Sequence, residues 1–133
     1  MQKIFVDTNY FIRHFVGDDP VQTSRARKLF KDAETGKVLL ATGPPVLFEM
    51  AWTLKKLYKK DKNYIIKAIS AVASLNWLEM PDKALVMKAV SLAESTGQDF
   101  ADAYIHTMAE SLGASSVATF NNSHFARMGT KIY

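Results

Sequence analysis

The chain contains no cysteine among its 133 residues. Disulfides, thiolate metal sites and cysteine nucleophiles are therefore excluded. No apolar stretch approaches the roughly 20 residues that are needed to span a bilayer. The N-terminus also lacks the order of basic, apolar and small residues that is typical of a signal peptide. Internal repeats and low-complexity segments are absent as well, and we therefore expect a soluble, cytoplasmic protein.

The length and composition are those of an ordinary globular protein. Hydrophobic residues make up 48% of the chain and charged residues 23%, and 133 residues suffice for one domain over residues 1–133 with a real core. The net charge is +4, and the excess lies in the first half: residues 1–66 carry 12 basic and 7 acidic side chains. A moderately basic protein is compatible with nucleic-acid binding but does not require it.

Apolar runs and helical patterns alternate along the chain. Strands are predicted at residues 2–7, 37–42, 77–80 and 115–120, with a possible edge strand at 131–133. Helices are predicted between them, at residues 20–35, 43–60, 62–75, 82–97 and 98–113. Strands that alternate with helices favour an α/β fold, in which a mostly parallel sheet is covered by helices on both faces.

Polar residues follow two of the predicted strands where ligand sites of such sheets gather, outside the carboxyl ends. Asp7 ends the first strand and is followed by Thr8 and Asn9, while Thr119 and Asn121 end the strand at 115–120. A carboxylate at the end of a buried strand must be capped, paired or bound to a cation. We therefore expect a site at Asp7.

Three further acids stand out from their surroundings. Glu49 lies in an otherwise apolar stretch, and Asp99 and Asp102 are three residues apart on one predicted helix. The favourable effect of an acid near a helix N-terminus explains Asp99 about as well as a site does. Asp102 is expected in the second turn, where that effect is weaker, so a functional role is favoured there.

Asp7, Glu49 and Asp102 come from three different elements. If they converge, their mutual repulsion requires a divalent cation, and oxygen ligands favour Mg²⁺ or Mn²⁺. Such a cluster commonly activates water for attack on a phosphodiester.

Four segments together resemble a known family, namely "IFVDTNYFIRHF", "LFEMAWTL", "DFADAYIHTMAE" and "VATFNNSHFARM". In this order they resemble the PIN domain, and more narrowly the VapC-type toxins of toxin–antitoxin pairs. The resemblance implies a three-layer α/β/α sandwich and cleavage of RNA with Mg²⁺ or Mn²⁺. It also implies a homodimer and an antitoxin protein partner.

The resemblance assigns roles to individual residues. It makes Asp7, Glu49 and Asp102 the catalytic, metal-binding acids, with Asp99 as an acidic neighbour and Thr8 close to the metal. Asn9 and Thr119 are auxiliary candidates. The family most often has an aspartate after "ATF", where this chain has Asn121. An amide oxygen ligates Mg²⁺ without adding negative charge, which puts a second metal in doubt.

Basic residues offer a surface for RNA phosphates or a solvated helix face. The candidates for phosphate contact are Arg13, Lys55, Lys56, Lys59 and Lys60, and contacts of this kind give affinity without sequence specificity. Among the aromatic residues, Trp52 is more often a core or interface residue than a platform for bases. For His106 a buried, hydrogen-bonded role is favoured over a place in the site.

The residues and the resemblance together predict a metal-dependent endoribonuclease that is the toxin of a toxin–antitoxin pair. One alternative is a PIN domain that binds RNA or a protein with little or no cleavage, as the missing acid at Asn121 suggests. Another is an RNA-processing nuclease that is no toxin.

Overall fold

The computed structural model describes residues 1–133, and its centre is a small parallel sheet. The strands are β1 (Lys3–Phe5), β2 (Leu39–Ala41) and β3 (Leu78–Glu79), with β2 in the middle. Ile4 lies opposite Leu40, and Leu40 in turn lies opposite Leu78. The outer edge of β1 therefore carries no further strand.

Seven helices make up most of the rest of the molecule. They are α1 (Thr8–Val16), α2 (Pro20–Glu34), α3 (Pro44–Lys56), α4 (Lys62–Ala73), α5 (Lys83–Thr96), α6 (Phe100–Ser111) and α7 (Asn122–Arg127). The predicted class, an α/β fold built on a parallel sheet, is confirmed. No helix of the protein is both long enough and apolar enough to cross a membrane.

Local chemistry explains where the principal helices begin. The carboxylates of Asp19 and Asp61 accept hydrogen bonds from backbone N–H groups three residues further on, as N-cap residues do. α3 begins instead with Pro44 and Pro45, whose missing N–H groups would be unpaired in a first turn anyway. The core contains 28 buried hydrophobic residues, and α3 contributes Leu47, Met50 and Leu54 from one face.

The ends of the three strands are joined by a short set of buried hydrogen bonds. The N–H of Val6 donates to the carbonyl of Ala41 at 2.8 Å, and the N–H of Thr42 donates to the carbonyl of Glu79 at 2.9 Å. The hydroxyl of Thr42 donates in turn to the carbonyl of Val6, at 2.9 Å. Thr42 is almost fully buried, so these bonds hold the exits of β1 and β2 together.

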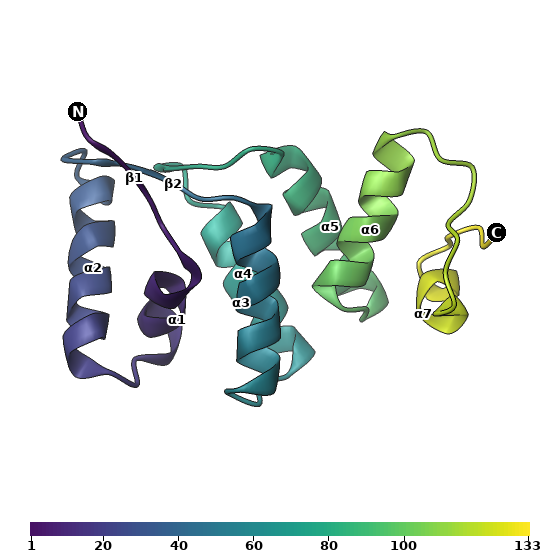
Figure 1. Ribbon diagram of the computed structural model, residues 1–133, viewed down its shortest axis with the longest axis horizontal. Helices are drawn as coiled ribbons and strands as arrows, with labels where there is room; N and C mark the ends of the chain where they lie inside the picture. The colour runs from purple at the N-terminus through teal and green to yellow at the C-terminus, as the bar shows by residue number, and fades with distance from the viewer.

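The molecule is elongated, and its two ends carry different elements. β1, α1 and α2 occupy one end, α3 and α4 the middle, and α6 and α7 the other end (Figure 1). α6 packs mainly against α5, and α5 packs against α4. This chain of helix contacts places the start of α6 away from the end of β1.

The strand predicted at residues 115–120 is wrong, as is the edge strand at 131–133. Both segments form only an isolated parallel bridge between Val117 and Ile132. The N–H of Val117 donates to the carbonyl of Lys131, and the carbonyl of Val117 accepts from Tyr133. The backbone of this segment is thus paired with the C-terminus and not with β1. The sequence analysis also missed the helices α1 and α7.

The buried bond of Thr42 leads to a stability prediction. Thr42→Val removes the hydroxyl while keeping the shape of the side chain, and it leaves the carbonyl of Val6 with one partner fewer. We expect the free energy of unfolding to fall by about 1–3 kcal/mol, as for other buried hydrogen bonds that lose one partner. Urea denaturation followed by circular dichroism measures it.

Thr35→Val is the matched control, because the hydroxyl of Thr35 bonds to a helix carbonyl on an exposed surface. We expect little change for this variant. Equal effects of the two substitutions would contradict a special role for Thr42.

Candidate active site

Asp7 follows β1 and is the N-cap of α1. Its carboxylate accepts a hydrogen bond from the N–H of Thr8 at 2.7 Å, and the side chain is exposed. The strand-end aspartate is therefore capped, and it remains open to solvent. Next to it the hydroxyl of Thr8 is buried and has no hydrogen-bond partner. A buried polar group without a partner is rare and carries a free-energy penalty.

Asp7 borders a cavity of about 490 Å³ whose other charged side chains are Arg25, Lys28 and Asp32. The Nζ of Lys28 donates to Asp32 at 2.9 Å. This hydrogen bond lowers the pKa of Asp32, with further help from the charges of Lys28 and Lys37. The cavity beside the end of β1 is thus basic as well as acidic.

Glu49 lies on α3 and is exposed, although its sequence neighbours are apolar. The buried residues of this helix, Leu47 and Met50, flank it on the face that packs into the core. Because successive helix residues point about 100° apart, Glu49 projects outward.

The structure corrects the expected position of Asp102. α6 begins at Phe100, with Asp99 as its N-cap residue, so Asp102 lies in the first turn and not the second. The favourable interaction of an acid with a helix N-terminus therefore applies to Asp102 too. The carboxylate of Asp99 makes no capping hydrogen bond. It lies 3.9 Å from the Nζ atoms of Lys55 and Lys62.

Asp102 is instead grouped with residues of α7. The Nδ1 of His124 lies 3.2 Å from a carboxylate oxygen of Asp102 and 2.9 Å from the side-chain amide of Asn121. The contact with Asn121 is made by its amide nitrogen. With a proton on Nδ1 the ring donates to Asp102, and without one Nδ1 accepts from Asn121 instead. Thr119 joins this group, because its hydroxyl accepts from the N–H of Asn121 at 3.0 Å.

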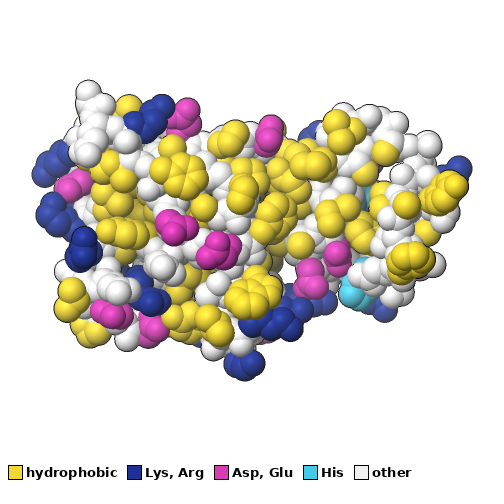
Figure 2. Space-filling model, in the orientation of Figure 1, with side chains coloured by type: hydrophobic (Ala, Val, Ile, Leu, Met, Phe, Trp, Pro, Cys, Tyr) yellow, Lys and Arg dark blue, Asp and Glu magenta, His cyan; other side chains and the backbone are white.

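The predicted acids therefore lie in separate places. Asp102 and Asn121 come together through His124, whereas Asp7 follows β1 and begins α1, a helix that lies apart from α6 and α7 in Figure 1. Nowhere do three histidine or acidic side chains form a group that could hold a metal ion. Figure 2 shows acidic side chains in separate small groups on this face, one near the middle and one beside a histidine, without one common patch. The expected convergence of Asp7, Glu49 and Asp102 is not present.

The reason lies in the segment at residues 115–120. If it paired with the free edge of β1, Thr119 and Asn121 would come beside Asp7, because the carboxyl ends of parallel strands share an edge. In the structure it pairs with the C-terminus, and α6 stays packed on α5. Phe5 on β1 and Phe120 are both left largely exposed, at 63% and 107%.

The predicted basic residues differ in whether their side chains already contact other groups of the protein. Arg13 is engaged, because its guanidinium donates to Gln22, Asp18 and the hydroxyl of Tyr58. The ammonium of Lys60 lies over the ring of Tyr64, 4.7 Å from its centroid. Lys55, Lys56 and Lys59 are exposed. Basic side chains gather along the lower edge of the middle of the molecule and over the α2 end (Figure 2).

His106, Asn9 and His124 differ in their surroundings. The Nδ1 of His106 lies 2.6 Å from the hydroxyl of Thr130, and the ring is mostly buried. The hydrogen-bonded role that was favoured for His106 is confirmed. Asn9 is exposed on α1. The sequence analysis missed His124, because no helical spacing links it to Asp102, 22 residues earlier.

The comparisons with known proteins identify one family. A model of the PIN domain matches residues 4–131, which is nearly the whole chain. No curated protein matches the chain closely enough to count as a relative.

The unpartnered hydroxyl of Thr8 gives a prediction next to Asp7. Thr8→Val keeps the shape and removes the orphaned polar atom, so we expect the free energy of unfolding to rise by about 1 kcal/mol. Urea denaturation in EDTA measures it. A fall in the free energy of unfolding of Thr8→Val, like the one expected for Thr42→Val, would mean that the Thr8 hydroxyl has a partner in solution.

Proposed function

The chain belongs to the PIN domain family, and from that premise we propose that it is an endoribonuclease that hydrolyses RNA phosphodiester bonds with Mg²⁺ or Mn²⁺. PIN domains are generally nucleases, and the match over residues 4–131 is the observation that carries the proposal. The carboxylates at Asp7 and Asp102 and the basic first half of the chain support it.

The proposed roles follow the residues that the family resemblance singles out. Asp7, Glu49 and Asp102 are the metal-binding and catalytic acids, and Asp99 and Asn121 are weaker contributors. Carboxylate and amide oxygens suit Mg²⁺ or Mn²⁺, which would supply an activated water and neutralise phosphate charge. Thr8, Asn9 and Thr119 are auxiliary residues beside these ligands.

The proposed metal-binding residues do not fit such a cation in their present arrangement. The acids form no metal-binding group, so no step of hydrolysis is assigned to a bound ion. The proposed site requires the group of Asp102, His124 and Asn121 to approach the end of β1. The free edge of β1 and the exposed side chains of Phe5 and Phe120 are features that such an approach would cover.

We also propose that the protein is the toxin of a toxin–antitoxin pair in the cytoplasm, forms a homodimer and is inhibited by a cognate antitoxin. α6 exposes Ile105 and Met108, and Leu112 follows it with 78% of its surface exposed. Apolar side chains gathered along one helix suit a protein interface.

A second candidate is a PIN domain that binds RNA or a protein partner and cuts weakly or not at all. Asn121 in place of an acid, and the separation of Asp7 from Asp102, favour it. An RNA-processing nuclease without a toxin role keeps the same site.

Cleavage of RNA is the first prediction from this proposal. Purified protein with Mg²⁺ or Mn²⁺ should cut total cellular RNA, and EDTA should abolish the cutting. Asp7→Asn and Asp102→Asn should each lower the cleavage rate by roughly 100-fold or more, as removal of a group that stabilises the transition state does. Gel analysis of the products over time measures the rate.

Glu94→Gln is the control, because Glu94 is an exposed acid on α5 outside the proposed site. It should cut like the unaltered protein. Cutting that survives EDTA or both aspartate substitutions would point to a contaminating nuclease. Folded protein that binds RNA without cutting it would favour the binding candidate.

The toxin role predicts an effect on growth. Induced expression of the chain in a bacterial host should arrest growth, whereas Asp102→Asn expressed to the same level should not. Colony counts after induction measure the effect. Cleavage in vitro combined with normal growth on expression would favour a processing nuclease.

A further inference from the structure

A cavity between α3, α4 and the start of α6 is separate from the end of β1. It has a volume of about 270 Å³. Its apolar wall comes from Phe48 and Trp52 of α3, Ile65 and Ile66 of α4, and Phe100 of α6. This is slightly smaller than pockets for drug-sized ligands, which span about 300–1,000 Å³. The size suits one flat ring system.

Helical spacing places the aromatic and basic side chains of α3 together. Trp52 lies four residues after Phe48 and three and four residues before Lys55 and Lys56, so all three neighbour Trp52 on the helix surface. Phe48 is held in place by aromatic contacts with Phe100 and Tyr104, at centroid distances of 5.4 and 4.9 Å. Trp52 makes no such contact and is 58% exposed. Its indole therefore offers a free flat surface.

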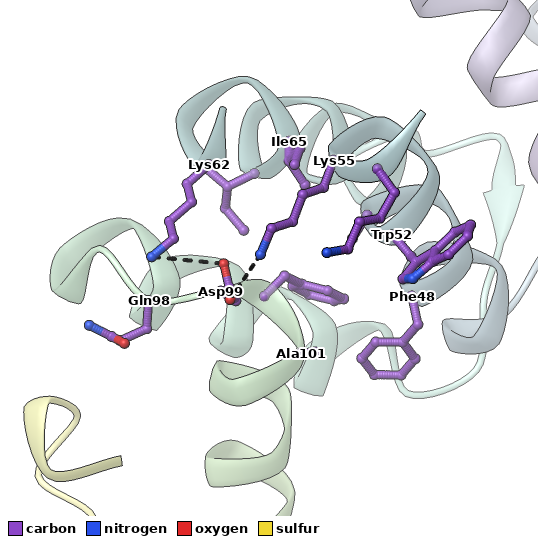
Figure 3. A pocket seen from close by; sticks show the side chains of 12 residues that line it. Phe48, Trp52, Lys55, Lys62, Ile65, Gln98, Asp99 and Ala101 are labelled. Carbon is purple, nitrogen blue, oxygen red and sulfur yellow. Dashed lines mark ion pairs between the residues drawn. The ribbon is translucent and has the colours of Figure 1, made fainter. Parts of the chain in front are cut away.

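The rim of the cavity is basic. Lys55, Lys56 and Lys62 line it with only one acid, Asp99, so its formal charge is +2. Figure 3 shows Lys55 and Lys62 both directed at Asp99, with Trp52 and Phe48 on the other side of the cavity. The two ion pairs are long, at 3.9 Å, and their lysines are about half exposed. Such pairs are weak, and Lys56 has no acidic partner.

A ligand that fits must combine a flat apolar group with negative charge. An unstacked nucleotide does so, because its base stacks on aromatic side chains and its flanking phosphates attract lysines. Bases within a duplex are already stacked and paired, so a single strand is needed to present such a base. The proposed ribonuclease function makes RNA the strand in question. A purely apolar ligand would leave the lysine rim unused.

We propose that this cavity binds one unstacked base of single-stranded RNA, with Trp52 against the base and Lys55, Lys56 and Lys62 near its phosphates. The inference rests on the proposed function, since it makes RNA the ligand. The inference goes beyond the proposed function by naming Trp52 as a residue that binds substrate. It also places this contact beside Asp99, the N-cap residue of the helix that carries Asp102.

Binding is measured without cleavage, in EDTA, by tryptophan fluorescence. The chain has two tryptophans, and Trp77→Phe leaves Trp52 as the only one. We expect a short oligouridine to quench the fluorescence of Trp52. An abasic backbone of the same length and charge should bind about 5- to 150-fold more weakly, which corresponds to the loss of about 1–3 kcal/mol of stacking.

Two substitutions separate the base from the phosphates, with RNA affinity measured by anisotropy of a labelled oligouridine. Trp52→Leu should abolish the preference for oligouridine over the abasic backbone, and Trp52→Phe should keep part of it. Lys56→Gln should weaken both ligands alike and reduce the slope of log affinity against log salt by about 0.7. Tyr133→Leu is the control, because Tyr133 is an exposed aromatic residue at the far end of the chain.

Equal affinity for oligouridine and the abasic backbone would overturn the inference, as would a Trp52→Leu variant that keeps the preference. Tighter binding of an acidic peptide than of oligouridine, with quenching of Trp52, would also overturn it and make the cavity a protein-binding site. Base-dependent binding by a protein that never cuts RNA would support the cavity and refute the proposed hydrolysis. Cleavage of RNA without base-dependent binding would support the proposed hydrolysis and refute the role of the cavity.

Discussion

The hydroxyl of Thr42 and its bond to the carbonyl of Val6 are the constraint on which the N-terminal half depends. Thr42 joins all three strands, because its backbone bonds to β3 and its side chain bonds to the residue after β1. The chain enters α1 directly after Val6 and enters α3 directly after Gly43. One buried side chain therefore fixes the position from which Asp7 projects relative to the helix that carries Glu49 and Trp52.

The C-terminal half depends on a different constraint, the packing of α6 on α5. α5 in turn packs against α4, so Asp102 is positioned by helix contacts and not by a strand of the sheet. His124 lies against Asp102, and Asn121 lies against His124. α6 also contacts α3 through Phe48, so both parts of the proposed site share one core. The pairing of Val117 with the C-terminus is what leaves Asn121 beside Asp102 and away from β1.

Much of this organisation could be predicted from residue patterns. The strand predicted at residues 2–7 and the helices predicted at 20–35 and 62–75 correspond to β1, α2 and α4. The segment around Val117 shows what residue patterns do not predict. An apolar run with strand composition can pair with any strand edge that is still open. Which partner it takes depends on contacts far along the chain. The same holds for the site: residue types and their order gave candidate acids, but whether these acids converge depends on tertiary contacts that their spacing does not specify.

Asp99 links the two halves electrostatically. It stands at the start of the helix that carries Asp102, and its carboxylate lies at equal distances from Lys55 of α3 and Lys62 of α4. Long ion pairs between partly exposed groups are easily replaced, because water and salt already screen them. A phosphate that took over these lysines would free the Asp99 carboxylate at the N-terminus of α6, where the helix favours negative charge. If RNA occupies the lysine rim as proposed, release of the Asp99 carboxylate near Asp102 would accompany its binding.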